Sequence, residues 1–181
     1  MCLFFLLGCV ENPPENPETL SFSYSSGAMH LDWGSYEVNV EPSGNGTLIK
    51  KMGMSMELQK TFSLSQGEMK EVFDTASKNG FFSLNDSYDD PFIMDGGWSR
   101  ISISTDSSTK TVSMSNYSLQ QFSAVESKII SLVTNKLGAN AFSLSDFKNY
   151  CPTKLAECSS IGTECGSKEC YDCEEWIYFC E

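Results

Sequence analysis

The stretch that decides the fold reads Tyr36-Glu37-Val38-Asn39-Val40-Glu41-Pro42-Ser43-Gly44-Asn45-Gly46-Thr47. Its first half alternates apolar and polar side chains, which is the period of a half-buried β-strand. Its second half places Asn45-Gly46 after a proline, and these residues supply the positive φ values of a tight hairpin. The stretch therefore predicts a strand that turns directly into an antiparallel partner, with one face of the pair buried.

The same alternation recurs on both sides of this hairpin. It predicts strands at residues 20–24, 36–41, 47–52, 57–62, 99–105 and 110–115. Two segments change to a helical period instead. Each opens with a capping box, Ser65 to Glu68 and Ser118 to Gln121, and each ends at a glycine, Gly80 or Gly138.

Strand runs without strict βαβ alternation favour an α+β fold. We expect a mostly antiparallel sheet of about five to six strands, covered by two amphipathic helices, with a small Cys-rich C-terminal tail.

The chain is acidic, with 12 cations against 24 carboxylates and a net charge of −12. Nucleic acid is therefore not an expected partner, because duplex binding needs a basic face. A hydrolase using the single histidine, His30, with Asp32 is one alternative, but the sequence has no Gly-x-Ser-x-Gly elbow. No apolar run reaches the roughly 18 residues of a membrane-spanning helix.

The N-terminus carries Leu6-Leu7-Gly8-Cys9 after a short apolar run. This tetrad resembles the lipobox of bacterial and archaeal lipoproteins. The resemblance implies that residues 1–8 are a signal peptide and that Cys9 carries the lipid. No Lys or Arg precedes Cys9, whereas signal peptides begin with a positive region. We therefore expect the natural start to lie upstream.

A tether follows the predicted lipid site. Residues 9–19 contain three prolines and three glutamates, which disfavour helix and central strand and predict an extended spacer. The expected organisation is a signal segment (1–8), a lipidated cysteine with its tether (9–19), an α+β domain (20–138) and a Cys-rich acidic tail (139–181). Such a protein is held at the cell surface or in the periplasm by its lipid.

The α+β domain itself resembles an uncharacterised domain that recurs in bacterial and archaeal secreted lipoproteins. The resembling segments are Tyr36-Glu37-Val38, Gly44 to Gly46, Thr61 to Ser65, Gly80-Phe81-Phe82-Ser83-Leu84 and Lys110-Thr111-Val112. These are packing and capping residues. The resemblance therefore implies a fold and a location, and no activity.

Two segments offer metal ligands. Asp86, Asp89, Asp90 and Asp95 lie in a glycine-containing acidic loop that could bind calcium, although its spacing is not that of an EF-hand. A solvated loop is the alternative. Met52, Met54 and Met56 alternate at a hairpin tip and could bind copper or simply pack in a core.

Six of the eight cysteines lie in the tail: Cys151, Cys158, Cys165, Cys170, Cys173 and Cys180. So short a segment must be held by disulfides or a metal, must dock on the domain, or both. Only one zinc-type knuckle is present, Cys170 to Cys173, and an extracytoplasmic location favours three disulfides. A redox-active Cys170–Cys173 pair is the alternative, which the surrounding carboxylates disfavour because they raise thiol pKa.

The sequence thus predicts a lipid-anchored extracytoplasmic binding or structural module with no cofactor and a protein or cell-envelope ligand. The alternatives are an envelope thiol oxidoreductase or hydrolase, and a metal-binding surface protein. No residue is predicted to be catalytic.

Overall fold

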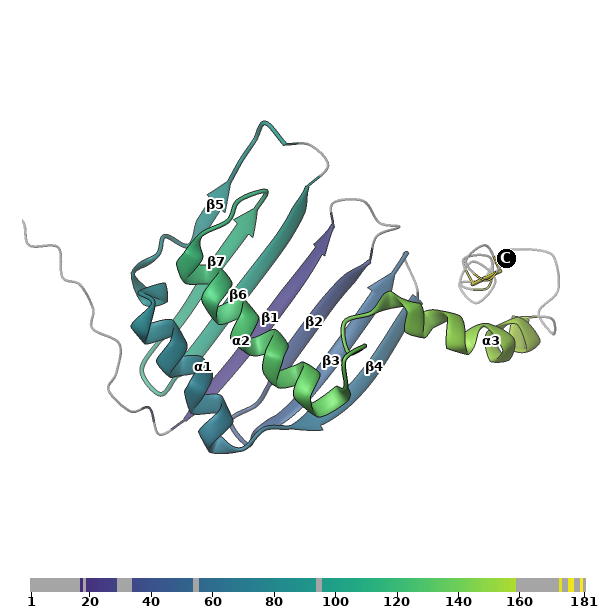
Figure 1. Cartoon of the computed structure of the whole chain (residues 1–181), viewed down its shortest axis with the longest axis horizontal. Helices are drawn as coiled ribbons and strands as arrows, with labels where there is room; N and C mark the ends of the chain where they lie inside the picture. Colours follow the sequence, from purple (N-terminus) through teal and green to yellow (C-terminus); the bar gives the residue numbers. More distant parts are fainter. Residues whose placement is uncertain are drawn as a thin grey trace, which may run out of the picture.

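A seven-stranded sheet with two long helices across one face forms the body of the protein (Figure 1). The computed structural model describes residues 17, 19–28, 34–53, 56–93, 96–158, 173, 176, 177 and 180. The strands are β1 (Leu20–Ala28), β2 (Ser35–Val40), β3 (Asn45–Met52), β4 (Met56–Ser63), β5 (Ser87–Asp89), β6 (Gly97–Thr105) and β7 (Thr109–Ser115). The helices are α1 (Gln66–Lys78), α2 (Gln120–Leu137) and α3 (Cys151–Cys158), with 3-10 helices η2 (Phe81–Ser83) and η3 (Leu144–Tyr150). The predicted α+β class is confirmed.

The sheet has the order β4-β3-β2-β1-β6-β7-β5, and every pair except one is antiparallel. The exception is β5, which pairs in parallel with β7 and adds a strand to the expected five or six. Three residues inside an acidic loop are too few to show an alternating period. Tyr88 holds the strand in place, because its ring packs on the main core and stacks on Tyr117 at 5.7 Å between centroids.

The two helix starts differ. The capping box at Ser65 is present: Ser65 N donates to Glu68 Oε2 at 2.8 Å, and Glu68 N donates to Ser65 Oγ at 3.3 Å. The second predicted box is wrong, because α2 begins after Leu119 and has no side-chain cap. Leu119, the residue before the helix, is partly buried and packs against the core in place of a capping side chain.

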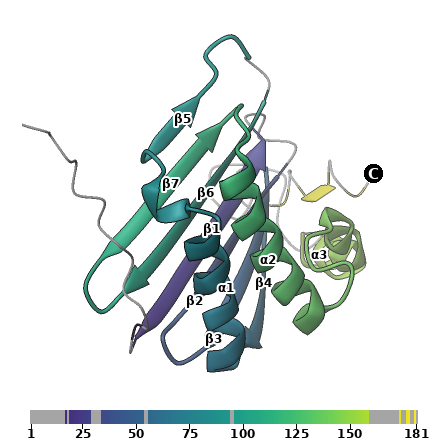
Figure 2. The ribbon, with the colours of Figure 1, turned by 60° about the vertical axis from the view of Figure 1, so that its left-hand side comes forward.

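The main core lies between α1, α2 and the sheet (Figure 2). Its strand residues are the alternate ones that face the helices. They include Leu20, Phe22, Tyr24, Val38, Val40, Leu48, Ile101, Ile103, Val112 and Met114. None of the helices in the described part of the chain is long and apolar enough to cross a membrane.

A buried lysine interrupts the apolar row on β3. Lys50 lies between Leu48 and Met52 on the helix side, and its side chain is wholly buried. Its Nζ donates to Ser143 O and to Asp146 Oδ2, both at 2.7 Å, and Lys60 Nζ lies 2.6 Å from the same Oδ2. These contacts bind η3 to β3 and β4.

A second, smaller core lies where the tail meets the sheet. It consists of Met52, Met56, Leu58, Phe147 and Trp176. The Phe147 and Trp176 ring centroids are 5.8 Å apart. Met52 and Met56 are therefore core residues; Met54 lies outside the described residues.

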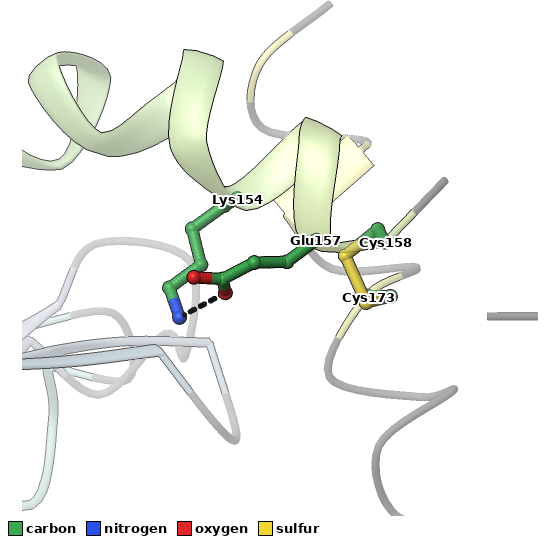
Figure 3. Close-up of a disulfide and its surroundings, with 4 residues drawn as sticks. All are labelled: Lys154, Glu157, Cys158 and Cys173. Atoms are coloured by element: carbon green, nitrogen blue, oxygen red, sulfur yellow. Dashed lines mark hydrogen bonds and ion pairs between the residues drawn. A yellow bond between two sulfur atoms is a disulfide. The ribbon is translucent and has the colours of Figure 1, made fainter. Parts of the chain in front are cut away.

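Two disulfides close the tail. Cys151 bonds to Cys180 and Cys158 bonds to Cys173, with Cα–Cα distances of 5.6 and 5.5 Å. Figure 3 shows the second bond beside the Lys154–Glu157 ion pair, whose Nζ–Oε2 distance is 2.8 Å. Because Cys173 bonds to Cys158, a Cys170–Cys173 redox pair does not form here. Cys165 and Cys170 lie outside the described residues, and their disulfide stays a prediction.

Replacing Asp146 with Asn should lower the free energy of unfolding by about 3 kcal/mol, since Lys50 is left buried without its counter-charge. Lys60→Gln is the matched control. Lys60 is partly exposed, so its loss should lower that free energy by about 1 kcal/mol or less. Urea unfolding at pH 7, followed by circular dichroism, measures both differences.

The effect of Asp146→Asn should also depend on pH. Burial raises the pKa of the Asp146 carboxyl, but the two ammonium groups outweigh it and hold the pKa below its ordinary value. The carboxylate's contribution is therefore complete above about pH 5 and declines as pH falls below about 4, the ordinary aspartate range. A difference that stayed constant down to about pH 3 would contradict this assignment.

Candidate functional site

The carboxylates of the predicted calcium loop do not converge within the described residues. Asp86 Oδ1 lies 2.6 Å from Lys110 Nζ, and Asp90 Oδ1 accepts the Phe92 N–H at 3.0 Å. Asp89 is exposed on β5, and Asp95 lies outside the described residues. No group of three or more potential metal ligands is found in the described ranges.

The remaining predicted residues of interest have no described structure. Cys9, His30 and Asp32 all lie outside the described residues.

The face of the sheet that turns away from α1 and α2, which we call the open face, is polar. On the central strand β1 its outward residues are all small: Ser21, Ser23, Ser25 and Gly27. At the positions paired with Ser25 and Gly27, the neighbouring strands present larger side chains on the open face. Ser25 lies between Glu37 of β2 and Arg100 of β6 in the strand register.

Small residues on the middle strand and large ones on both sides leave a trough along β1. We name as the β1 trough the groove with Ser23 and Ser25 as its floor, Glu37 and Asn39 as one wall, and Trp98 and Arg100 as the other. Its volume is about 580 Å³. Because neighbouring strands are about 4.8 Å apart, the backbones of the two walls are about 10 Å apart.

The walls carry opposite charges. Glu37 accepts a hydrogen bond from Asn39 Nδ2 at 2.9 Å and lies 3.4 Å from Lys51 Nζ. The Asn39 bond is the main cause that lowers the pKa of the Glu37 carboxyl; partial burial opposes it and Lys51 lowers it further. Glu37 is therefore an anion at neutral pH.

Arg100 is the single arginine of the chain. Its Nε donates to Ser113 Oγ of β7 at 3.0 Å, so this part of the guanidinium is held on the β7 side of β6, while Arg100 still lines the trough. No carboxylate of the described chain forms an ion pair with it. Within the described residues, its guanidinium therefore has the Ser113 hydroxyl and no carboxylate as a partner.

Trp98 closes one end of the trough. Its indole Cζ2 and Nε1 lie 3.2 Å from the place where a Cβ on Gly27 would project, and Ser35 Cβ lies 2.8 Å from that place. The absence of a side chain at Gly27 is what lets the indole lean across β1.

Sequence reasoning did not find this site. The serine alternation of β1 is visible in the sequence, and Arg100 is conspicuous because it has no companion. However, 68 residues separate the end of β1 from the start of β6, and nothing local indicates that β6 becomes the neighbour of β1. Only that pairing brings Arg100 opposite Glu37 across Ser25 and places Trp98 beside Gly27.

Gly27→Ala should displace the Trp98 indole. We expect a loss of about 1–3 kcal/mol in unfolding free energy, because the added methyl group overpacks the strand pair. The indole N–H signal of Trp98, assigned with Trp98→Phe, should shift in the ¹H–¹⁵N spectrum. Ser23→Ala, on the same face of the same strand, should leave that signal in place. An unmoved Trp98 signal in Gly27→Ala would show that the close approach is wrong.

Comparison with known proteins adds no assignment. No protein-family model matches the chain, and no curated protein matches it. The resemblance to secreted lipoprotein domains stays an expectation, and the β1 trough is the feature from which a function can be argued.

Proposed function

We propose that the protein is an extracytoplasmic binding module, anchored by a lipid on Cys9, whose β1 trough binds a component of the cell envelope. The observation that carries this proposal is the open face. Among the described elements, both long helices pack on the opposite face, and the open face presents a trough lined by polar groups and one indole.

The two disulfides support the location. Disulfides persist in oxidising compartments and are rare in the cytosol. Cys151–Cys180 and Cys158–Cys173 therefore indicate an oxidising environment, which agrees with an extracytoplasmic protein. The lipobox resemblance at Cys9 and the proline-rich tether supply the proposed means of attachment.

The strand register bears on how the domain would be oriented relative to the membrane. Leu20, directly after the tether, lies opposite Thr105, whereas Gly27 lies opposite Trp98 at the other end of β1. Leu20 and Gly27 are about 23 Å apart along the strand. With the proposed anchor at Cys9, the Trp98 end of the trough is proposed to be the end farther from the membrane.

The anchor is tested by labelling. Cells that express the protein from its expected upstream start and are fed an alkyne-bearing fatty acid should label the wild-type protein and should not label Cys9→Ser. The Cys9→Ser protein should also move from the membrane to the soluble fraction. Cys2→Ser is the matched control and should be labelled like the wild type if its cysteine leaves with the signal peptide. Labelled Cys9→Ser would overturn the assignment.

The binding role is tested by co-sedimentation. Envelope material stripped of protein by protease and detergent should sediment the full chain from detergent solution. Trp98→Ala and Arg100→Ala should each weaken this binding by about tenfold or more, the loss expected for anchors at the centre of an interface. Thr61→Ala changes the same open face on β4, outside the trough, and should bind like the wild type. Equal sedimentation of all four proteins would show that the trough is not the binding site.

A further inference from the structure

The shape of the β1 trough limits its occupant. The trough runs along strand β1, on which about 13 Å separates Ser23 of the floor from Gly27, the residue beside Trp98. Its volume of about 580 Å³ lies within the usual range of ligand sites. An extended segment of chain fits such a groove better than a compact solute, which would be covered on one side only.

The lining groups both donate and accept hydrogen bonds. The serine hydroxyls and the Asn39 amide do both, Arg100 donates, and Glu37 accepts. Sugar hydroxyls likewise donate and accept, so a saccharide can pair with every one of these groups. A peptide binds a sheet mainly through its backbone, at an edge strand. Strand β1 is central, and its backbone already pairs with β2 and β6. A peptide therefore cannot pair its backbone with β1.

Trp98 adds an aromatic surface at the end of this polar groove. An indole presents an apolar ring together with one N–H donor. The C–H face of a sugar ring is apolar while its rim carries hydroxyls, so one sugar can contact the indole and the polar walls together.

The charges favour an uncharged ligand. Glu37 and Arg100 contribute one charge of each sign to opposite walls. The whole chain has a net charge of −12, which repels polyanions. The trough also lacks the cluster of cations that a sulfated or phosphorylated chain would need.

We infer that the β1 trough binds a neutral glycan segment, with Trp98 contacting a sugar ring and Arg100, Asn39 and Glu37 pairing with its hydroxyls. This inference rests on the proposed function and names its ligand class.

A glycan array tests the inference with the full chain in detergent micelles. The array carries neutral chains of glucose, mannose and N-acetylglucosamine, uronic-acid and sulfated chains, and unrelated peptides. The wild type should bind at least one neutral chain and neither charged chains nor peptides. Trp98→Ala should lose about thirtyfold or more in affinity for that chain, as for a central aromatic anchor.

Two further variants separate the trough from general effects on folding. Ser25→Leu fills the floor and leaves both walls intact, and it should abolish binding. Thr61→Ala should bind like the wild type. Only variants whose thermal midpoint of unfolding equals that of the wild type are compared. A variant with a lower midpoint is replaced by the milder Trp98→Phe or Ser25→Val.

Each remaining outcome overturns the inference. Binding to charged chains or peptides alone, sensitive to Trp98→Ala, would show that the ligand class is wrong while the trough remains a binding site. Binding to no member of the array, or binding unaffected by Ser25→Leu, would remove the glycan assignment. Co-sedimentation with envelope material then decides independently whether the proposed function falls with it.

Discussion

The alternation of side chains on β1 is the constraint on which the structure depends. Leu20, Phe22 and Tyr24 point to the helices, so Ser21, Ser23 and Ser25 must point the other way. A one-residue slip in register would expose the apolar set and bury the serines. Burial on one face of this central strand therefore determines both the core and the floor of the trough, and the two cannot vary independently.

Lys50 has a different role from the apolar core residues around it. A buried ion pair is weak evidence for stability, because desolvation offsets much of its Coulomb energy. The contribution of the Lys50 ion pair is instead to fix the position of η3 on the sheet. Only a carboxylate and a carbonyl at the right place satisfy the Lys50 ammonium, and η3 supplies both through Asp146 and Ser143. This interaction fixes η3 on β3, and Phe147 of η3 packs with Met52 and Leu58 in the smaller core.

Much of the fold could be predicted from local sequence patterns. The hairpin at residues 36–47, the capping box at Ser65 and the apolar stripes of both long helices depend on neighbours a few residues away, and the structure contains them. Strand β5 was missed because three residues show no period. Lys50 was missed because an alternating strand predicts an apolar residue there. The trough was missed because it arises from the pairing of β1 with β6, which is distant in sequence.

The central position of β1 also has a mechanical consequence. The strand follows the tether directly and is paired with β2 over six residues and with β6 over nine. With the proposed lipid anchor, a pull on the membrane side acts along β1 and loads both ladders in shear, so many hydrogen bonds share the load. A tether joined to an edge strand would instead peel its ladder open one bond at a time. In the proposed arrangement, a force between the bound ligand and the anchor would pass through the strand best placed to resist it.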